Sequence, residues 1–282
     1  MKSSQRTARL AVVLVLAGTT LVVAENRKEL HFKVAHRASV SVMNQYGPIT
    51  VKPATGNLVE VVAILHSDKV EVDNSQSGDR IEIQSHLLPG ADAESGRVDY
   101  EIQVPTGASV TLHSTTGSLH AEKLQGDVTV EGANADVDVR EISDAHVHIK
   151  TLNGPVTLTD IRDGHVEITS VSGDVIMTSV NGPLVQVNSN SGKIRYDGEF
   201  GGGGDYYLTS HTGDIEATAP SYASIDVYAR SEHGQVENDF TLNPKHTSLA
   251  IKAGSAFAGT VGKAASSVKL LSFSGKIHLK KR

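Results

Sequence analysis

Short alternations of apolar and polar residues, each about four or five positions long, recur through the middle of the chain between small polar turns. The turn residues follow one another about nine or ten positions apart, and most of them are glycine. Alternation of this length is typical of a short β-strand with one buried face, and fixed-period self-similarity indicates a repeat architecture. The turn positions are Gly117, Gly126, Ala135, Ala145, Gly154, Gly164, Gly173, Gly182 and Gly192, with the alanines at degenerate glycine positions.

Two such units make a longer repeat of about 19 residues, because every second turn carries the better-formed corner, rich in Ser, Thr or Asn-Gly. We therefore predict an all-β, single-domain parallel β-solenoid (β-helix-like) with two short strands and two distinct corners per coil. Coils of this kind stack about 4.8 Å apart and pair strand on strand. The predicted inward column is Leu119, Val128, Val137, Val147, Val156, Val166, Val175, Leu184, Ile194, Ile215 and Val236.

An antiparallel sandwich is the alternative, since it also shows turn signals at regular spacing. The solenoid is favoured because equivalent positions carry the same residue type and not merely the same pattern. Stacked corners explain a repeated serine, because hydroxyl groups of successive coils can bond the backbone and one another.

The chain divides into a predicted signal peptide over residues 1–24, a strand-rich cap with the first coils over 25–112, and a regular solenoid with a C-terminal cap over 113–282. The last two segments are expected to form one continuous domain. Region 25–112 has longer strands without the tight period, and solenoid ends need such a cover because an open end exposes unpaired backbone.

The first residues look like an export signal. Lys2, Arg6 and Arg9 precede an apolar stretch over residues 10–23 that is too short for a good transmembrane span, and we expect cleavage after Ala24. The protein is then exported, to the periplasm, the cell surface or the medium, with no transmembrane segment after cleavage. The sequence has no cysteine, which excludes a disulfide and a lipid anchor on cysteine.

The net charge of the chain limits the kinds of partner that it is expected to bind. The formal net charge is −6, and loss of the basic signal segment makes the remainder more acidic still. A protein of this charge is not expected to bind nucleic acid. The basic end over residues 276–282 is better explained as a charged cap on a terminal strand.

Several of these segments resemble a known family. Residues 44–51 with their Gly-Pro-Ile, residues 100–105 leading to the corner at 114–117, the repeated Ser-x-Ser-Gly and Asn-Gly turns, and the closing segment 274–277 are similar to the adhesin-like family of bacterial β-solenoids. The resemblance covers about residues 38–280, nearly the whole of the expected exported chain. It implies the fold and an adhesin-like role, and it supplies no catalytic residues.

One group of side chains could bind a metal ion. His146 and His165 each follow a turn position, so they are expected on neighbouring coils, with His148 and Glu167 two residues further along the same outward face. Imidazole and carboxylate groups at this spacing are suitable zinc ligands. The alternative is a polar outward row that aligns by chance, on a sheet too flat for tetrahedral geometry.

Two further groups have simpler explanations. The acidic residues Asp136, Asp138 and Asp174 suit a solvated face, because the calcium-binding nonapeptide of other solenoids is missing. The aromatic residues Phe200, Tyr206 and Tyr207 are better explained by core or cap packing than by an exposed contact patch.

We expect no catalytic residues and no cofactor, because the chain lacks a nucleophile elbow, a phosphate loop and a His-Glu-x-x-His motif. The predicted function is that of an exported, non-enzymatic, adhesin-like binding protein, with an unknown protein or glycan of the cell envelope as partner. A passive structural spacer is the first alternative, and a β-helix enzyme acting on envelope glycans is the second. The sequence leaves the oligomeric state open.

Overall fold

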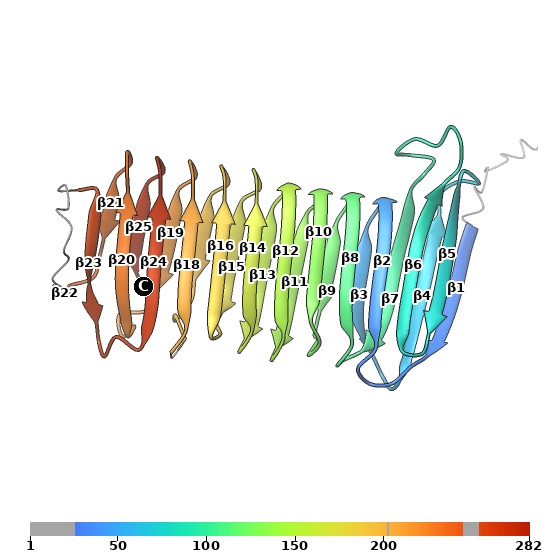
Figure 1. The fold of residues 1–282 in the computed structure, drawn as a ribbon, viewed down its shortest axis with the longest axis horizontal. Coiled ribbons are helices and arrows are strands. Elements are labelled where there is room, and N and C mark those ends of the chain that lie inside the picture. The colour runs from blue at the N-terminus through green and yellow to red at the C-terminus, as the bar shows by residue number, and fades with distance from the viewer. Residues whose placement is uncertain (1–25, 202, 245–253) are drawn as a thin grey trace, which may run out of the picture.

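The computed structural model describes residues 26–201, 203–244 and 254–282, and these form a long rod of stacked coils (Figure 1). The described residues contain strands and no helix. Two sheets of 12 and 13 strands run along the rod and face each other across the core. The prediction of an all-β parallel solenoid is confirmed. The predicted signal peptide, residues 1–24, lies outside the described residues.

The 12-stranded sheet is called sheet A, and the 13-stranded sheet is called sheet B. Sheet A comprises, in spatial order, β1 (Asn26–Lys33), β4 (Leu58–Leu65), β7 (Val98–Pro105), β3 (Ile49–Ala54), β9 (Leu119–Glu122), β11 (Val137–Ser143), β13 (Val156–Arg162), β15 (Val175–Val180), β17 (Ile194–Asp197), β19 (Ile215–Ala219), β25 (Ile277–Lys281) and β21 (Val236–Asn238). Sheet B comprises β22 (Asn243–Pro244), β23 (Ala256–Val261), β20 (Ile225–Ser231), β24 (Ser266–Ser272), β18 (Asp205–Ser210), β16 (Leu184–Ser189), β14 (His165–Ser170), β12 (His146–Asn153), β10 (Val128–Asn134), β8 (Ser109–Thr116), β2 (Ser39–Tyr46), β6 (Arg80–Leu87) and β5 (Val70–Ser77).

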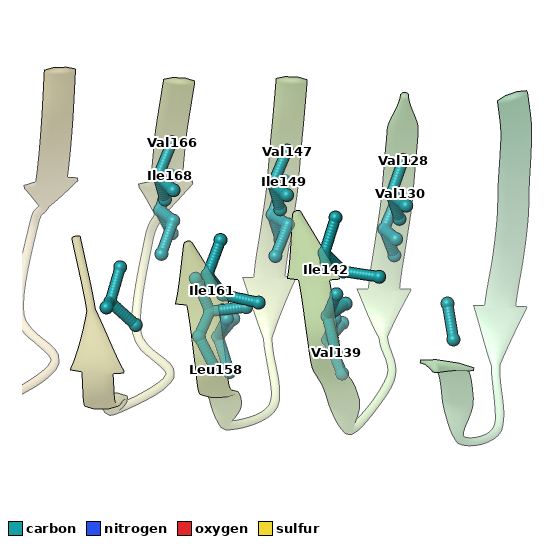
Figure 2. Close-up of a cluster of buried hydrophobic side chains, with 14 of the residues drawn as sticks. Val128, Val130, Val139, Ile142, Val147, Ile149, Leu158, Ile161, Val166 and Ile168 are labelled. Carbon is teal, nitrogen blue, oxygen red and sulfur yellow. The ribbon is translucent and has the colours of Figure 1, made fainter. Parts of the chain in front are cut away.

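The strands pair in register, so that like residues stack on like. Val128 lies opposite Val147, and Val147 lies opposite Val166. The equivalent turn residues Asp127 and His146 are 19 positions apart in the chain and bonded to each other. Branched aliphatic side chains from both sheets fill the narrow space between them (Figure 2), as a pleated and buried surface favours.

Nine of the 11 predicted inward residues are buried, from Leu119 and Val128 to Ile194 and Ile215. Leu184 was wrongly placed in this column: it lies opposite His165 and is only partly buried, while Val185 takes the inward position opposite Val166. Pro183 adds one residue between the Gly182 corner and the strand, which shifts the pattern. Val236 is also only partly buried, because β21 is the last strand of sheet A.

One corner of each coil is a stack of glycines in which the backbones touch. A Cβ on Gly173 would lie 1.7 Å from the Gly154 carbonyl oxygen, so no other residue fits there. Ala135 occupies the equivalent position one coil earlier, where its carbonyl oxygen lies 2.2 Å from the place of a Cβ on Gly154. The assignment of Ala135 to a degenerate glycine position is therefore confirmed.

Buried hydroxyl groups accompany this corner. The Ser170 hydroxyl donates to the Gly173 carbonyl at 2.9 Å, and Ser189 donates to Gly192 at 3.0 Å. The row recurs near the ends of β8, β12, β14, β16, β18, β20 and β24 and satisfies backbone groups that the turn leaves free. Its buried members are Ser114, Thr151, Ser170, Ser189, Ser210, Ser231 and Ser272.

Both ends of the rod depart from chain order. The first coil, β2 with β3, is inserted between β6–β7 and β8–β9. The last coil, β24 with β25, is inserted between β18–β19 and β20–β21. Antiparallel strands, β1, β4 and β5 at one end and β23 at the other, then cover the stack.

Tyr196, Phe200 and Tyr206 form a packed aromatic cluster. Phe200 stacks on Tyr196 with ring centroids 4.4 Å apart, and Tyr206 meets Phe200 edge-on at 5.0 Å. All three side chains are buried. The expected core packing is confirmed for Phe200 and Tyr206. Tyr207 is only partly buried, with the Lys269 ammonium over its ring.

Candidate functional site

The histidine patch lies where the sequence placed it. His146 is opposite His165 on β12 and β14, and His148 is opposite Glu167. The two stacked rings have centroids 4.9 Å apart. The His148 Nδ1 lies 3.3 Å from the Glu167 Oε2.

The four side chains form two separate pairs. His146 also contacts Asp127 of the preceding coil, whose Oδ1 lies 3.5 Å from its Nδ1 and accepts its backbone N–H at 2.9 Å. Within the described ranges, no group of three or more His, Cys, Asp or Glu side chains is arranged to hold a metal ion. The neighbouring placement is confirmed, and metal binding stays a prediction.

Acidic residues on sheet A pair with basic side chains of the same or the neighbouring coil. Asp138 lies 3.2 Å from the Nδ1 of His120 and also contacts Arg140. Further along, the Lys280 ammonium donates a hydrogen bond to Glu216 at 2.9 Å and lowers the pKa of that carboxyl. Alternating charges of this kind bind one coil to the next and leave no continuous acidic face at Asp138.

A different feature, which the sequence did not predict, breaks the regular surface of sheet B. A shallow cavity of about 360 Å³ lies at the ends of β8, β10, β12 and β14. Gly132 and Ala133 form its floor, and Leu152 and Val171 form an apolar wall. These two wall residues are 55% and 42% exposed, which places them among the few large apolar side chains that the described surface leaves open to solvent. We call this feature the apolar hollow.

The hollow lies where an outward position of β10 carries only a methyl group. Ala133 occupies this position, whereas the neighbouring coils carry Thr115 and Leu152 there. The adjacent Gly132 belongs to the buried row, and a Cβ on it would point inward and lie 2.8 Å from that of Ala135. The signal in the sequence is the small Ala133 between larger outward residues.

Charged residues line the other side of the hollow as a self-neutralising row. Glu131 lies between His113 and Lys150. The Glu131 Oε2 is 3.5 Å from the His113 Nδ1, and the Glu131 Oε1 is 3.9 Å from the Lys150 Nζ. A ligand in the hollow therefore meets an apolar wall and a polar rim whose charges already have partners. Contact would depend mainly on burial of apolar surface.

The family model for Toastrack DUF4097 matches residues 38–280. The chain belongs to this family. Its range agrees with the extent of the resemblance to adhesin-like β-solenoids, which is thereby confirmed. No curated protein matches the chain.

Two solved structures are similar to this Toastrack protein at low sequence identity. A "putative cell adhesion protein" from Clostridium sporogenes is 13% identical, covers 91% of this chain and 100% of its own, and has a TM-score of 0.30. A "putative adhesin" from Bacteroides fragilis is 9% identical, covers 92% of this chain and 99% of its own, and has a TM-score of 0.41. A search of the described residues for a membrane span finds no sufficiently long and apolar helix.

Proposed function

We propose that this Toastrack protein is an exported, non-enzymatic, adhesin-like binding module whose contact surface is the apolar hollow. Its partner is a protein or glycan of the cell envelope. The observation that carries the proposal is the exposed apolar pair Leu152 and Val171, next to the small residues Gly132 and Ala133 and a row of paired charges.

An apolar centre with a polar rim is the usual composition of a binding interface. The centre of such an interface excludes water, while the rim supplies orientation. In the hollow, Leu152 and Val171 take the first role, and the row of His113, Glu131 and Lys150 takes the second. Burial stabilises contact by about 25 cal/mol per Å² of apolar surface.

The surrounding chemistry supports binding more than catalysis. The titratable groups near the hollow lie in exposed cross-coil pairs on a sheet face, whereas an active site needs groups that converge in a cleft. The proposal therefore assigns no catalytic residue, no cofactor and no nucleic acid partner. Export rests on the predicted signal at residues 1–24.

The test is binding of the purified protein to fractionated envelope proteins and to a glycan panel. Leu152→Lys, alone and with Val171→Lys, should abolish saturable binding, because each places a charge on the apolar wall. Thr178→Lys is the matched control, since it adds the same charge to an exposed position on the opposite sheet.

The outcomes separate the alternatives. Binding that survives both wall substitutions overturns the hollow as the site. No saturable binding to any fraction favours a structural spacer, and shortened glycan products favour an enzyme. The thermal midpoint of each variant should match that of the parent, because both wall residues point outward.

A further inference from the structure

The two sheets end in four edge strands, and these edges differ. At the C-terminal end, β21 has 3 residues and β22 has 2, the second of which is Pro244. At the N-terminal end, β1 and β5 each have 8 residues and form the outermost strands of the rod (Figure 1). Long edge strands are the ones that can pair with another chain.

Only alternate residues of β1 have their backbone groups hydrogen-bonded to β4. Val34 donates its N–H to the Asn57 carbonyl at 3.2 Å, and the antiparallel register with β4 continues without a break to Asn26. Alternate residues of such a ladder turn both backbone groups to the same neighbour. The even-numbered residues of β1 therefore bond to β4, and the odd-numbered ones, including Glu29 and His31, direct theirs outward.

Little covers this outer side within the described part of the chain. The Gln76 amide donates to the Lys33 carbonyl at 2.9 Å. The described residues supply no hydrogen-bond partner for the outward backbone groups of Arg27, Glu29 and His31. These groups lie in a straight row along the end of sheet A.

The other long edge is better guarded. The Lys28 ammonium reaches across the end of the rod and donates to the Val72 carbonyl of β5 at 2.6 Å. Strand β5 also carries the exposed carboxylates Glu71 and Asp73 and a polar second half. An outward carbonyl of β5 is thus already occupied. Strand β1 is charged as well, so it admits only a strand whose charges complement its own.

The side chains of β1 indicate what would pair there. Arg27, Lys28 and Lys33 outweigh Glu29, so the strand is basic on a protein with a net charge of −6. Phe32, buried, and Leu30, partly buried, point to the core side, while the odd-numbered residues point to solvent. A matching strand therefore alternates apolar residues on the core side with acidic residues on the solvent side.

We propose that the outer edge of β1 receives one further β-strand from an extended acidic polypeptide. Main-chain hydrogen bonds to Glu29 and His31 would fix the strand, and Arg27 and Lys33 would select for its carboxylates. A second copy of this protein suits the edge less well, because two-fold pairing along the whole of β1 places Arg27 opposite Lys33. The site shares no residue with the apolar hollow and is independent of it.

The probe is a fluorescent decapeptide that alternates valine and glutamate, with a valine–lysine decapeptide as its charge control. The purified protein should bind the acidic peptide saturably, more weakly as salt rises from about 50 to about 500 mM, since screening reduces exposed charge attraction. His31→Pro removes an outward N–H without touching the β4 ladder and should reduce affinity at least about tenfold.

Asn74→Pro is the matched control, because it makes the corresponding change on β5. It should leave peptide binding intact. A second variant, Arg27→Glu with Lys33→Glu, keeps all backbone groups and should reverse the preference to the valine–lysine peptide. This charge swap keeps the proposal testable if His31→Pro lowers the thermal midpoint.

Three results would overturn the proposal. One is equal affinity of the parent and His31→Pro for the acidic peptide. Another is loss of binding in Asn74→Pro alone, which would place the site on β5. The third is a dimer in sedimentation that His31→Pro dissolves and the acidic peptide does not displace, which would make a second copy the occupant.

Discussion

The middle of the rod and its two ends are both built from β-strands, but the strands are ordered and paired differently. In the middle, from β10 to β17, the order of coils in the stack is the order in the chain, and each coil repeats the corner of the one before. At both ends, the coil that is terminal in the sequence lies between two other coils in the stack, and antiparallel strands cover the outside. The difference shows that local repetition builds a stack, while ending a stack requires long-range pairing.

The insertion at the C-terminal end keeps the register of the repeat. Tyr206, Val268 and Val227 stand in one row of sheet B, and Ile215, Ile277 and Val236 stand in one row of sheet A. The last coil of the chain therefore has neighbours on both sides, as a middle coil does. A coil that is terminal in sequence is thus internal in structure.

The largest expected effect is the loss of a middle coil. Val156→Asp buries a charge between the sheets and should lower the free energy of unfolding by more than about 3 kcal/mol, because several coils lose their packing together. Val70→Asp makes the same change in β5, where only the cap should open. Urea unfolding followed by circular dichroism measures both. An unchanged midpoint for Val156→Asp would disprove the inward position of this residue.

The next effect tests whether the C-terminal coil behaves as an internal one. Leu270 is fully buried on β24, and Leu270→Ala should lower the free energy of unfolding by about 2–5 kcal/mol. Leu30→Ala in β1 is the control, because its side chain is only partly buried on an edge strand. Comparable losses for the two variants would contradict the inserted position of the last coil. Hydrogen exchange should show slow amides in β24 and fast ones in β1.

A smaller effect separates the glycine corners. Gly173→Ala pushes a methyl group into the backbone of the preceding coil and should destabilise the protein by about 1–3 kcal/mol. Gly78→Ala, in the β5–β6 turn, meets no atom within 4 Å and retains only the strain of its φ of 61°. Gly78→Ala should therefore be the milder change in thermal unfolding, and the reverse order would argue against close stacking of the middle corners.

The smallest effect concerns pH at the C-terminal end. The pKa of Glu216 is lowered by the Lys280 hydrogen bond, so its contribution is present above the ordinary glutamate pKa and is lost as pH falls through the lowered value. Glu216→Gln should therefore reduce the drop in thermal midpoint that the parent shows between about pH 5 and pH 3. Glu60→Gln on β4 is a control at the other end, and an equal change there would remove the special role of the Lys280 pair.

The repeat was visible in the sequence because each coil satisfies its own corner. Glycine, a hydroxyl residue and an alternating strand are local requirements, so their period predicted the parallel stack and the facing of His146 with His165. Leu184 was misplaced for the same reason: Pro183 adds a residue that only strand pairing reveals. The apolar hollow was missed because its small floor and its wall come from three successive coils.

The amino-acid sequence by itself determined the solenoid, its corners and most of its buried column, since these depend on contacts that every coil repeats. The tertiary structure decided how the ends close, which edge of the rod keeps unpaired backbone groups, and where the small Ala133 lies beside Leu152 and Val171 in one hollow. Those features depend on which strands become neighbours. Which strands become neighbours depends on the whole stack. A strand that has no fixed partner within its own repeat pairs with whichever sheet edge must be covered.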